Sequence, residues 1–163
     1  MNRINYFVMD VDGTLTDGKI YMGNGGEVCK AFHVKDGCGI HDILLPNGII
    51  PVIITGRSSA IVKMRCEELE IREIYQGVKE KLDILKKLLE ENSCELKNVA
   101  YIGDDINDLP CMQAVKEAGG LVACPKDAVN KVIEIAHFVS SKDGGNGAVR
   151  EFIEWIMQRN KTA

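Results

Sequence analysis

"YFVMDVDGTLTDG", residues 6–18, is a run of four apolar residues that leads directly into two carboxylates. An uninterrupted apolar run is typical of a strand buried on both faces, as in a parallel sheet. Asp10 and Asp12 lie two positions apart, and on a strand such residues point the same way. Two like charges held together are unfavourable unless a cation lies between them or one carboxyl keeps its proton. The stretch predicts a buried strand that ends either in a polar turn at Gly13 or in a metal-assisted site.

The rest of the chain alternates strand-like and helix-like segments. Apolar runs predict further strands over residues 49–55, 98–103, 120–124 and 137–140. Helical spacing of apolar residues predicts four helices: one that Ser58 or Ser59 caps and that ends near Leu69, and three over 79–92, 126–136 and 148–160. This order is typical of an α/β protein with a Rossmann-like three-layer fold, in which helices cover both faces of a mainly parallel sheet.

One segment, "KIYMGNGGEVCKAFHV" (19–34), breaks the alternation. It contains two strand-like runs around Asn24-Gly25-Gly26, which is a strong signal for a β-hairpin. We expect a short hairpin insertion at about residues 18–34 within a single domain, 1–163. A free hairpin would expose the edges of its strands, so this segment favours an oligomer.

The composition excludes several classes of protein. The chain has 163 residues and a formal net charge of −4, and its scattered Lys and Arg residues give no indication of a nucleic-acid partner. No apolar run is long enough to span a bilayer and the first residues lack a signal-peptide core, so we expect a cytoplasmic protein without membrane contacts. The cysteines show no CxxC spacing, and we interpret them as reduced, buried thiols (Cys29, Cys38, Cys66, Cys94, Cys111 and Cys124).

Polar side chains follow the apolar strands at the points where the strands end. In an open α/β sheet, ligands bind beyond these carboxyl ends. The residues expected there form an oxygen-rich set without histidine, which suits Mg²⁺. An aspartate can attack phosphorus, and a second carboxyl can protonate the leaving oxygen. The set therefore predicts Mg²⁺-dependent phosphoryl transfer by Asp10, Asp12, Thr55, Lys81, Asp104 and Asp105.

A signalling receiver domain is an alternative that uses the same residue types. It is also a parallel α/β sheet with acids, Thr and Lys at strand ends, and it accepts a phosphoryl group without turnover. Its acidic pair is typically adjacent on the first strand, and its lysine follows the threonine on a later strand. Here the adjacent pair Asp104-Asp105 comes late and Lys81 lies in a helical pattern. This order favours the enzyme over a non-catalytic phosphoacceptor or regulatory module.

Taken together and in order, "DVDGTLTDG", "ITGR", Lys81 and "GDDIND" resemble the motifs of the haloacid dehalogenase superfamily of phosphatases. The resemblance implies that Asp10 is the nucleophile and that Asp12 is the general acid/base, with its backbone carbonyl on the Mg²⁺ ion. It also implies that Thr55 and Lys81 bind the phosphoryl group. Asp10, Asp12 and Asp104 would be the metal ligands, supported through water or hydrogen bonds by Asp105 and Asp108.

Over nearly its whole length the chain resembles one family in this superfamily, the capless 3-deoxy-D-manno-octulosonate 8-phosphate phosphatases. The gaps between Asp12, Thr55 and Lys81 are too short to hold a cap domain. The resemblance implies hydrolysis of this sugar acid phosphate, in lipopolysaccharide biosynthesis, to 3-deoxy-D-manno-octulosonate and phosphate. It further implies a homotetramer in which the hairpins form a central barrel and neighbouring subunits close each active site.

The resemblance also places substrate contacts on several matching positions. At two of these, His33 and His41, the family carries Asn and Arg. Related capless enzymes act on nine-carbon sialic-type acid 9-phosphates, and they tend to carry Glu where Arg57 follows Thr-Gly here. Without the resemblance, Arg65 is about as well explained as part of a solvated helix face. The implied substrate-binding residues are Asp12, His33, Val34, Lys35, Asp36, Gly37, His41, Gly56, Arg57, Arg65 and Lys81.

Overall fold

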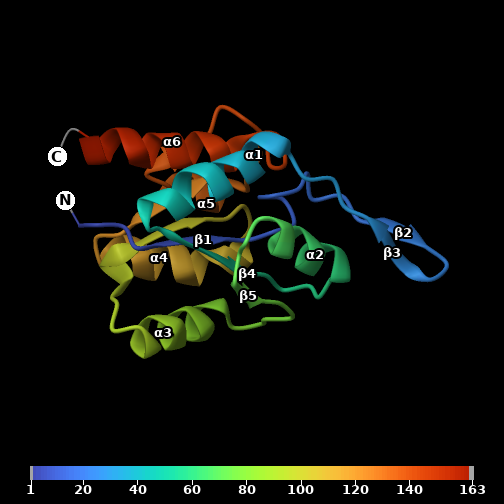
Figure 1. The fold of residues 1–163 in the computed structure, drawn as a ribbon, viewed down its shortest axis with the longest axis horizontal. Helices are drawn as coiled ribbons and strands as arrows, with labels where there is room; N and C mark the ends of the chain where they lie inside the picture. The colour runs from blue at the N-terminus through green and yellow to red at the C-terminus, as the bar shows by residue number, and fades with distance from the viewer. Residues whose placement is uncertain (1, 162–163) are drawn as a thin grey trace.

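The computed structural model describes residues 2–161, and its centre is a six-stranded, all-parallel sheet with the order β5-β4-β1-β6-β7-β8 (Figure 1). The strand β1 lies between β4 and β6. The later strands therefore extend the sheet in two directions, through β4 to β5 at one edge and through β6 and β7 to β8 at the other. The fold is therefore α/β with a parallel sheet, as the alternating pattern predicted. The strands are β1 (Tyr6–Met9), β4 (Ile50–Ile54), β5 (Glu73–Tyr75), β6 (Val99–Ile102), β7 (Leu121–Cys124) and β8 (Phe138–Val139).

Helices cover both faces of the sheet, which gives three layers (Figure 1). Side chains on β1 alternate between the two cores. Phe7 and Met9 face the first core, which is formed with η1 (Gly39–Leu44), α2 (Ala60–Glu68) and α6 (Ala148–Lys161). The short helices α1 (Val34–Cys38) and η2 (Leu45–Asn47) precede and follow η1 in the chain. Tyr6 and Val8 face the second core, which is formed with α3 (Lys81–Glu91), α4 (Leu109–Glu117) and α5 (Asn130–Ile135). Two short 3₁₀ turns, η3 (Leu96–Asn98) and η4 (Ile106–Asp108), flank β6.

The predicted elements are present, with ends that differ by a few residues. Ser59, and not Ser58, caps α2: its hydroxyl accepts from the Val62 amide. The sequence patterns did not predict the helical segment 34–47, the helix α4 or the strand β5. The first carries two glycines and a proline, the second starts directly after an acidic run, and the third is a short, half-buried edge strand.

The predicted hairpin forms a separate two-stranded antiparallel sheet, β2 (Tyr21–Gly23) and β3 (Gly26–Cys29). Figure 1 shows that it projects from the layered body beyond α2. Its turn falls at Asn24-Gly25, as expected for this sequence. Met22 and Val28 are 62% and 61% exposed, so the hairpin presents apolar surface to solvent. Apart from this hairpin, only the helical segment 34–47 lies between β1 and β4.

The cysteines are all free, but the prediction that they are buried is wrong for two of them. Cys66, Cys111 and Cys124 are buried, and Cys94 is half-buried. The thiols of residues 29 and 38 are exposed, because no second sheet covers the hairpin and because α1 lies at the surface. Within the described range, no helix has the length and apolar character needed to span a bilayer.

Candidate active site

The carboxyl ends of the three adjacent strands β4, β1 and β6 bring most of the predicted site together. Asp10 follows β1, Thr55 follows β4 and Asp104 follows β6. They share an open cavity of about 300 Å³ with further residues of the predicted set. Asn107 also lines the cavity, and no pattern in the sequence had singled it out. The full lining is Asp10, Asp12, Gly13, Gly18, Thr55, Gly56, Arg57, Asp104, Asp105 and Asn107.

Lys81 lies beneath this cavity, at the first residue of α3. Its Nζ is 2.9 Å from Asp10 Oδ1 and 2.8 Å from Asp108 Oδ1. Burial alone would lower the pKa of Lys81, but the two carboxylates outweigh it, so that its pKa is raised. The side chain is therefore a fixed ammonium between two acids, although it lies 71 positions from Asp10 in the sequence and 27 from Asp108.

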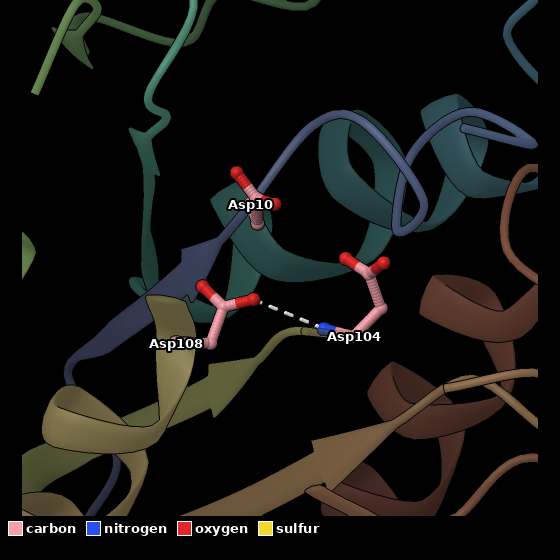
Figure 2. Close-up of side chains that lie close together, drawn as sticks. All are labelled: Asp10, Asp104 and Asp108. Atoms are coloured by element: carbon pink, nitrogen blue, oxygen red, sulfur yellow. Dashed lines mark hydrogen bonds between the residues drawn. The ribbon is translucent and has the colours of Figure 1, made fainter. Parts of the chain in front are cut away.

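Asp108 is the fully buried anchor of the site. One carboxylate oxygen accepts from Lys81 and, at 2.8 Å, from the Tyr101 hydroxyl. The other accepts from the Asp104 amide at 3.0 Å (Figure 2) and from the Asp105 amide at 3.3 Å. Both oxygens are thus occupied by protein donors, so Asp108 orients its neighbours. No pattern in the sequence indicated this role for Tyr101, because the residue lies inside the apolar strand β6, where a tyrosine is expected to pack in the core.

Asp10 and Asp104 complete an acidic cluster with Asp108, and ligand atoms of the three carboxylates lie within 4.8 Å of one another (Figure 2). Burial raises the pKa of Asp104 to about 8, and the charges of Asp10 and Asp108 add to this effect. Burial and the charge of Asp108 also raise the pKa of Asp10, to about 6, against the opposing effect of Lys81. A bound cation would relieve this excess of negative charge, and an all-oxygen donor set suits Mg²⁺. The residues present therefore fit a magnesium ion.

The turn after β1 is shaped around the Asp104 carboxylate. Thr14 Oγ1 donates to Asp104 Oδ1 at 3.0 Å. Gly13 has φ = +91°, and a Cβ atom there would overlap the Asp104 side chain. Only glycine can adopt this conformation and leave that space free. The glycine of the motif therefore does more than permit a bend, since it also makes room for a carboxylate of the cavity.

Asp12 lines the cavity but stays outside the acidic cluster. Its Oδ1 pairs with the ammonium of Lys30, which the chain contributes just after β3. Its Oδ2 is 3.8 Å from Arg57 Nε. Two cations thus flank the carboxyl that the sequence predicted as general acid/base. Lys30 was not among the predicted site residues, because a lysine after a hairpin strand gives no local sign of burial.

The loop 33–37, predicted to contact substrate, lies outside this cavity in the isolated chain. His33 caps α1, and with Lys35 it lines another depression, of about 510 Å³, next to the start of α6. Val34 is exposed, whereas Gly37 is buried against Arg65. Asp36 is also buried, and it accepts from the Gly147 amide at 3.3 Å and from the Arg150 amide at 2.8 Å.

His41 and Arg65 are likewise separate from the cavity. His41 is exposed, with Nδ1 2.7 Å from Asp42 Oδ1. Arg65 pairs with Glu68 at 2.7 Å and lies over the Phe32 ring, 5.9 Å from its centroid. One chain therefore brings together the predicted phosphoryl-transfer residues, while the predicted sugar-acid contacts other than Asp12, Gly56, Arg57 and Lys81 lie elsewhere on it.

Comparison with known proteins gives consistent matches. The family model for haloacid dehalogenase-like hydrolases matches residues 67–153. Over 155 residues the chain is 45% identical to the 3-deoxy-D-manno-octulosonate 8-phosphate phosphatase KdsC of Salmonella typhi. This match covers 95% of this chain and 80% of the Salmonella protein. A crystal structure of the phosphatase of this name from Yersinia pestis matches with a TM-score of 0.89 and 42% identity, covering 95% and 81% of the two chains.

A second crystal structure is similar to the same extent. It contains the 3-deoxy-D-manno-octulosonate 8-phosphate phosphatase of Moraxella catarrhalis in complex with magnesium, phosphate and KDO. The match has a TM-score of 0.88 and 42% identity, and it covers 95% of this chain and 86% of that one. The likeness thus extends over almost the whole chain.

Proposed function

Because this chain belongs to the haloacid dehalogenase-like hydrolase family, we propose that it is a Mg²⁺-dependent phosphatase. Its substrate would be 3-deoxy-D-manno-octulosonate 8-phosphate, which it would convert to the free sugar acid and phosphate. The observation that carries the proposal is Asp10, a buried carboxylate held by Lys81 at 2.9 Å beside the Asp104 carboxylate, at an open cavity. The names of the similar proteins support this choice of substrate.

The reaction would proceed in two steps that use neighbouring carboxyls of the first motif. In the first, an Asp10 oxygen attacks phosphorus while the bond from phosphorus to the sugar oxygen breaks, and Asp12 gives its proton to that oxygen. In the second, a water oxygen attacks phosphorus and the bond to Asp10 breaks. Asp12 takes the proton of the water, and phosphate leaves. Each step returns Asp12 to the form that the next one needs.

The ion would be held by the side chains of Asp10 and Asp104 and by the backbone carbonyl of Asp12. When bound, Mg²⁺ supplies positive charge that offsets the charge of the phosphoryl oxygens. Asp108 already accepts four hydrogen bonds from the protein. We assign to it, with Asp105, the support of the Asp104 loop and not a place among the metal ligands.

Thr55 and Lys81 would bind the phosphoryl oxygens from the protein side. The ammonium of Lys81 is fixed by Asp10 and Asp108, so its charge needs no rearrangement during the reaction. The backbone of Thr55 is fixed as well: its amide donates to the Tyr75 carbonyl at 2.9 Å, and its carbonyl accepts from the Val78 amide at 3.0 Å. Such fixed donors lower the free energy of the transition state more than mobile ones.

The sugar acid would be bound where subunits meet. In the isolated chain the loop 33–37 and the side chains of His41 and Arg65 lie outside the cavity, so they need a neighbouring subunit to contact the same substrate. The exposed apolar hairpin offers a surface on which copies of a single-domain chain can associate. We therefore propose a cytoplasmic homotetramer in which neighbouring subunits close each active site.

Phosphate release, measured with Mg²⁺ and with EDTA over a panel of phosphates, tests this function. The panel holds the octulosonate 8-phosphate, nine-carbon sialic-type acid 9-phosphates, neutral hexose phosphates and 4-nitrophenyl phosphate. We expect release only with the ion, and a preference of about 100-fold in kcat/KM, or 2–3 kcal/mol, for the octulosonate. A preference for a nine-carbon acid would reassign the substrate, and release that EDTA does not affect would contradict the metal site.

A further inference from the structure

Lys30 is a buried charge for which the proposed function has no use. The side chain is 1% exposed, although it belongs to a hairpin that is otherwise largely open to solvent. Its ammonium contacts Asp12 Oδ1 and lies 3.0 Å from Glu27 Oε1. A lysine is rarely this buried unless acidic partners hold it. The pairing therefore fixes where the hairpin meets the carboxyl that would transfer protons.

Glu27 extends this contact to the loop that follows β4. The Ser59 hydroxyl donates to Glu27 Oε2, and Arg57 Nη2 lies 3.9 Å from Glu27 Oε1. The Ser59 amide in turn donates to the Gln76 side chain at 2.7 Å. The strand β3 is thus attached through Glu27 to the same loop that carries Arg57 into the cavity.

We propose that Lys30 is a positioning residue that aims the Asp12 carboxyl at the leaving oxygen of the substrate, and that Glu27 holds Lys30 in place for this task. The inference rests on the proposed function, because it gives Asp12 the role of proton donor. With Oδ1 paired to Lys30, the oxygen Oδ2 remains on the side of Arg57, which lines the cavity. The hairpin, which lies outside the parallel sheet, therefore sets the orientation of the proton donor.

The orientation of the Asp12 carboxyl matters for one chemical step, the protonation of the leaving oxygen. As the bond from phosphorus to the leaving oxygen breaks, the proton of Asp12 Oδ2 moves to that oxygen, and the resulting carboxylate stays paired with Lys30. A carboxyl that can rotate freely would meet the leaving oxygen less often in the productive geometry. The loss is large for a sugar alkoxide, which must be protonated as it leaves. It is small for 4-nitrophenolate, which leaves without a proton.

The test compares kcat/KM for the two kinds of leaving group in K30M, K30R and K19M. The parameter kcat/KM covers the first irreversible step, so it reports loss of the leaving group and not the later attack of water. Methionine keeps the approximate length and removes the charge, and arginine restores the charge. Lys19 lies in the same segment but is exposed, and among the described residues its ion pair is with Asp17, so K19M is the matched control.

We expect K30M to lower kcat/KM for the sugar acid phosphate by about 100-fold and for 4-nitrophenyl phosphate by less than about 5-fold. K30R should recover most of the loss, and K19M should match the wild type on both substrates. If K30M lost activity equally on both, Lys30 would merely hold the hairpin, and the inference would be wrong. Unchanged activity on both would overturn it as well.

A second variant keeps the inference testable if K30M does not fold. E27Q keeps the size of the side chain and weakens its hold on Lys30, and we expect the same asymmetry between the substrates, at about 10-fold. Equal losses in E27Q would contradict the inference. Failure of the proposed function is seen separately: the wild type would then release phosphate from neither substrate, and a role for Lys30 in that reaction would fall with it.

Discussion

The cavity floor and the outer loop of this protein differ in one respect: a single chain brings the residues of the floor together at the cavity, but it does not bring the residues of the outer loop there. The floor consists of Asp10, Lys81, Tyr101, Asp104 and Asp108, which are joined by hydrogen bonds and ion pairs beneath the cavity. The outer loop, residues 33–41, comprises His33, α1 and the start of η1, and through His33 and Lys35 it lines the separate depression beside α6. The difference teaches that, in the proposed function, the strand ends of a single subunit would carry phosphoryl transfer, whereas recognition of the sugar acid would depend on surfaces that one subunit does not bring together.

The largest effect is expected from the floor itself. D10N removes the proposed nucleophile, and we expect kcat/KM to fall by at least about 10⁴-fold, or 5–6 kcal/mol, on every phosphate tested. Asn keeps the shape of the side chain, so circular dichroism should show an unchanged fold. D17N is the matched control, since Asp17 belongs to the same motif but lines no part of the cavity. Normal turnover in D10N would show that the cavity floor has no catalytic role.

The anchor of the floor should be the next most sensitive position. D108A leaves the ammonium of Lys81 with one acid instead of two and the Tyr101 hydroxyl without its acceptor. We expect a loss of about 3–5 kcal/mol in the free energy of unfolding, measured by urea titration. E90A, at an exposed position of α3, should change it by no more than about 0.5 kcal/mol. A stable D108A protein would show that the floor is less interdependent than its contacts indicate.

Substitution in the outer loop should affect one substrate class only. In K35A we expect kcat/KM for the octulosonate 8-phosphate to fall about 10-fold, or about 1.4 kcal/mol, because the proposed charge-assisted contact of Lys35 with the substrate carboxylate would be lost. Hydrolysis of 4-nitrophenyl phosphate, which has no such carboxylate, should not change. K86A, on α3, provides the control for loss of one surface charge. An equal fall on both substrates would show that Lys35 acts in phosphoryl transfer, like the residues of the cavity floor, and not in recognition of the substrate carboxylate.

The smallest effect on the folded chain is expected at the hairpin. V28D puts a charge on an exposed apolar side chain, so its free energy of unfolding as a monomer should change by no more than about 0.5 kcal/mol. Light scattering should nevertheless show a shift from the proposed tetramer to smaller species, accompanied by loss of the proposed preference for the sugar acid phosphate. If the dissociated protein kept that preference, the outer loop would not need a neighbouring subunit.

The fold could be predicted largely from local patterns, because the buried strands β1, β4 and β6 are apolar runs that end in polar residues. The edge strand β5 and the segment 34–47 carry no such pattern. The acids of the site could be predicted as well, since strands of a parallel sheet deliver their carboxyl ends to one edge. What could not be predicted are side-chain pairs without a local sign: Tyr101 with Asp108, and Lys30 with Asp12.

The role of Asp10 can be observed directly by mass spectrometry. D12N removes the carboxyl that is proposed to activate water, so a phosphoryl group transferred from 4-nitrophenyl phosphate should stay on the enzyme. We predict that acid quenching and peptide analysis find this group on the peptide that contains Asp10, and on no peptide in the double variant D10N/D12N. A phosphoryl group on another residue, or phosphate release by D12N without any phosphorylated peptide, would contradict a nucleophilic Asp10 on the cavity floor.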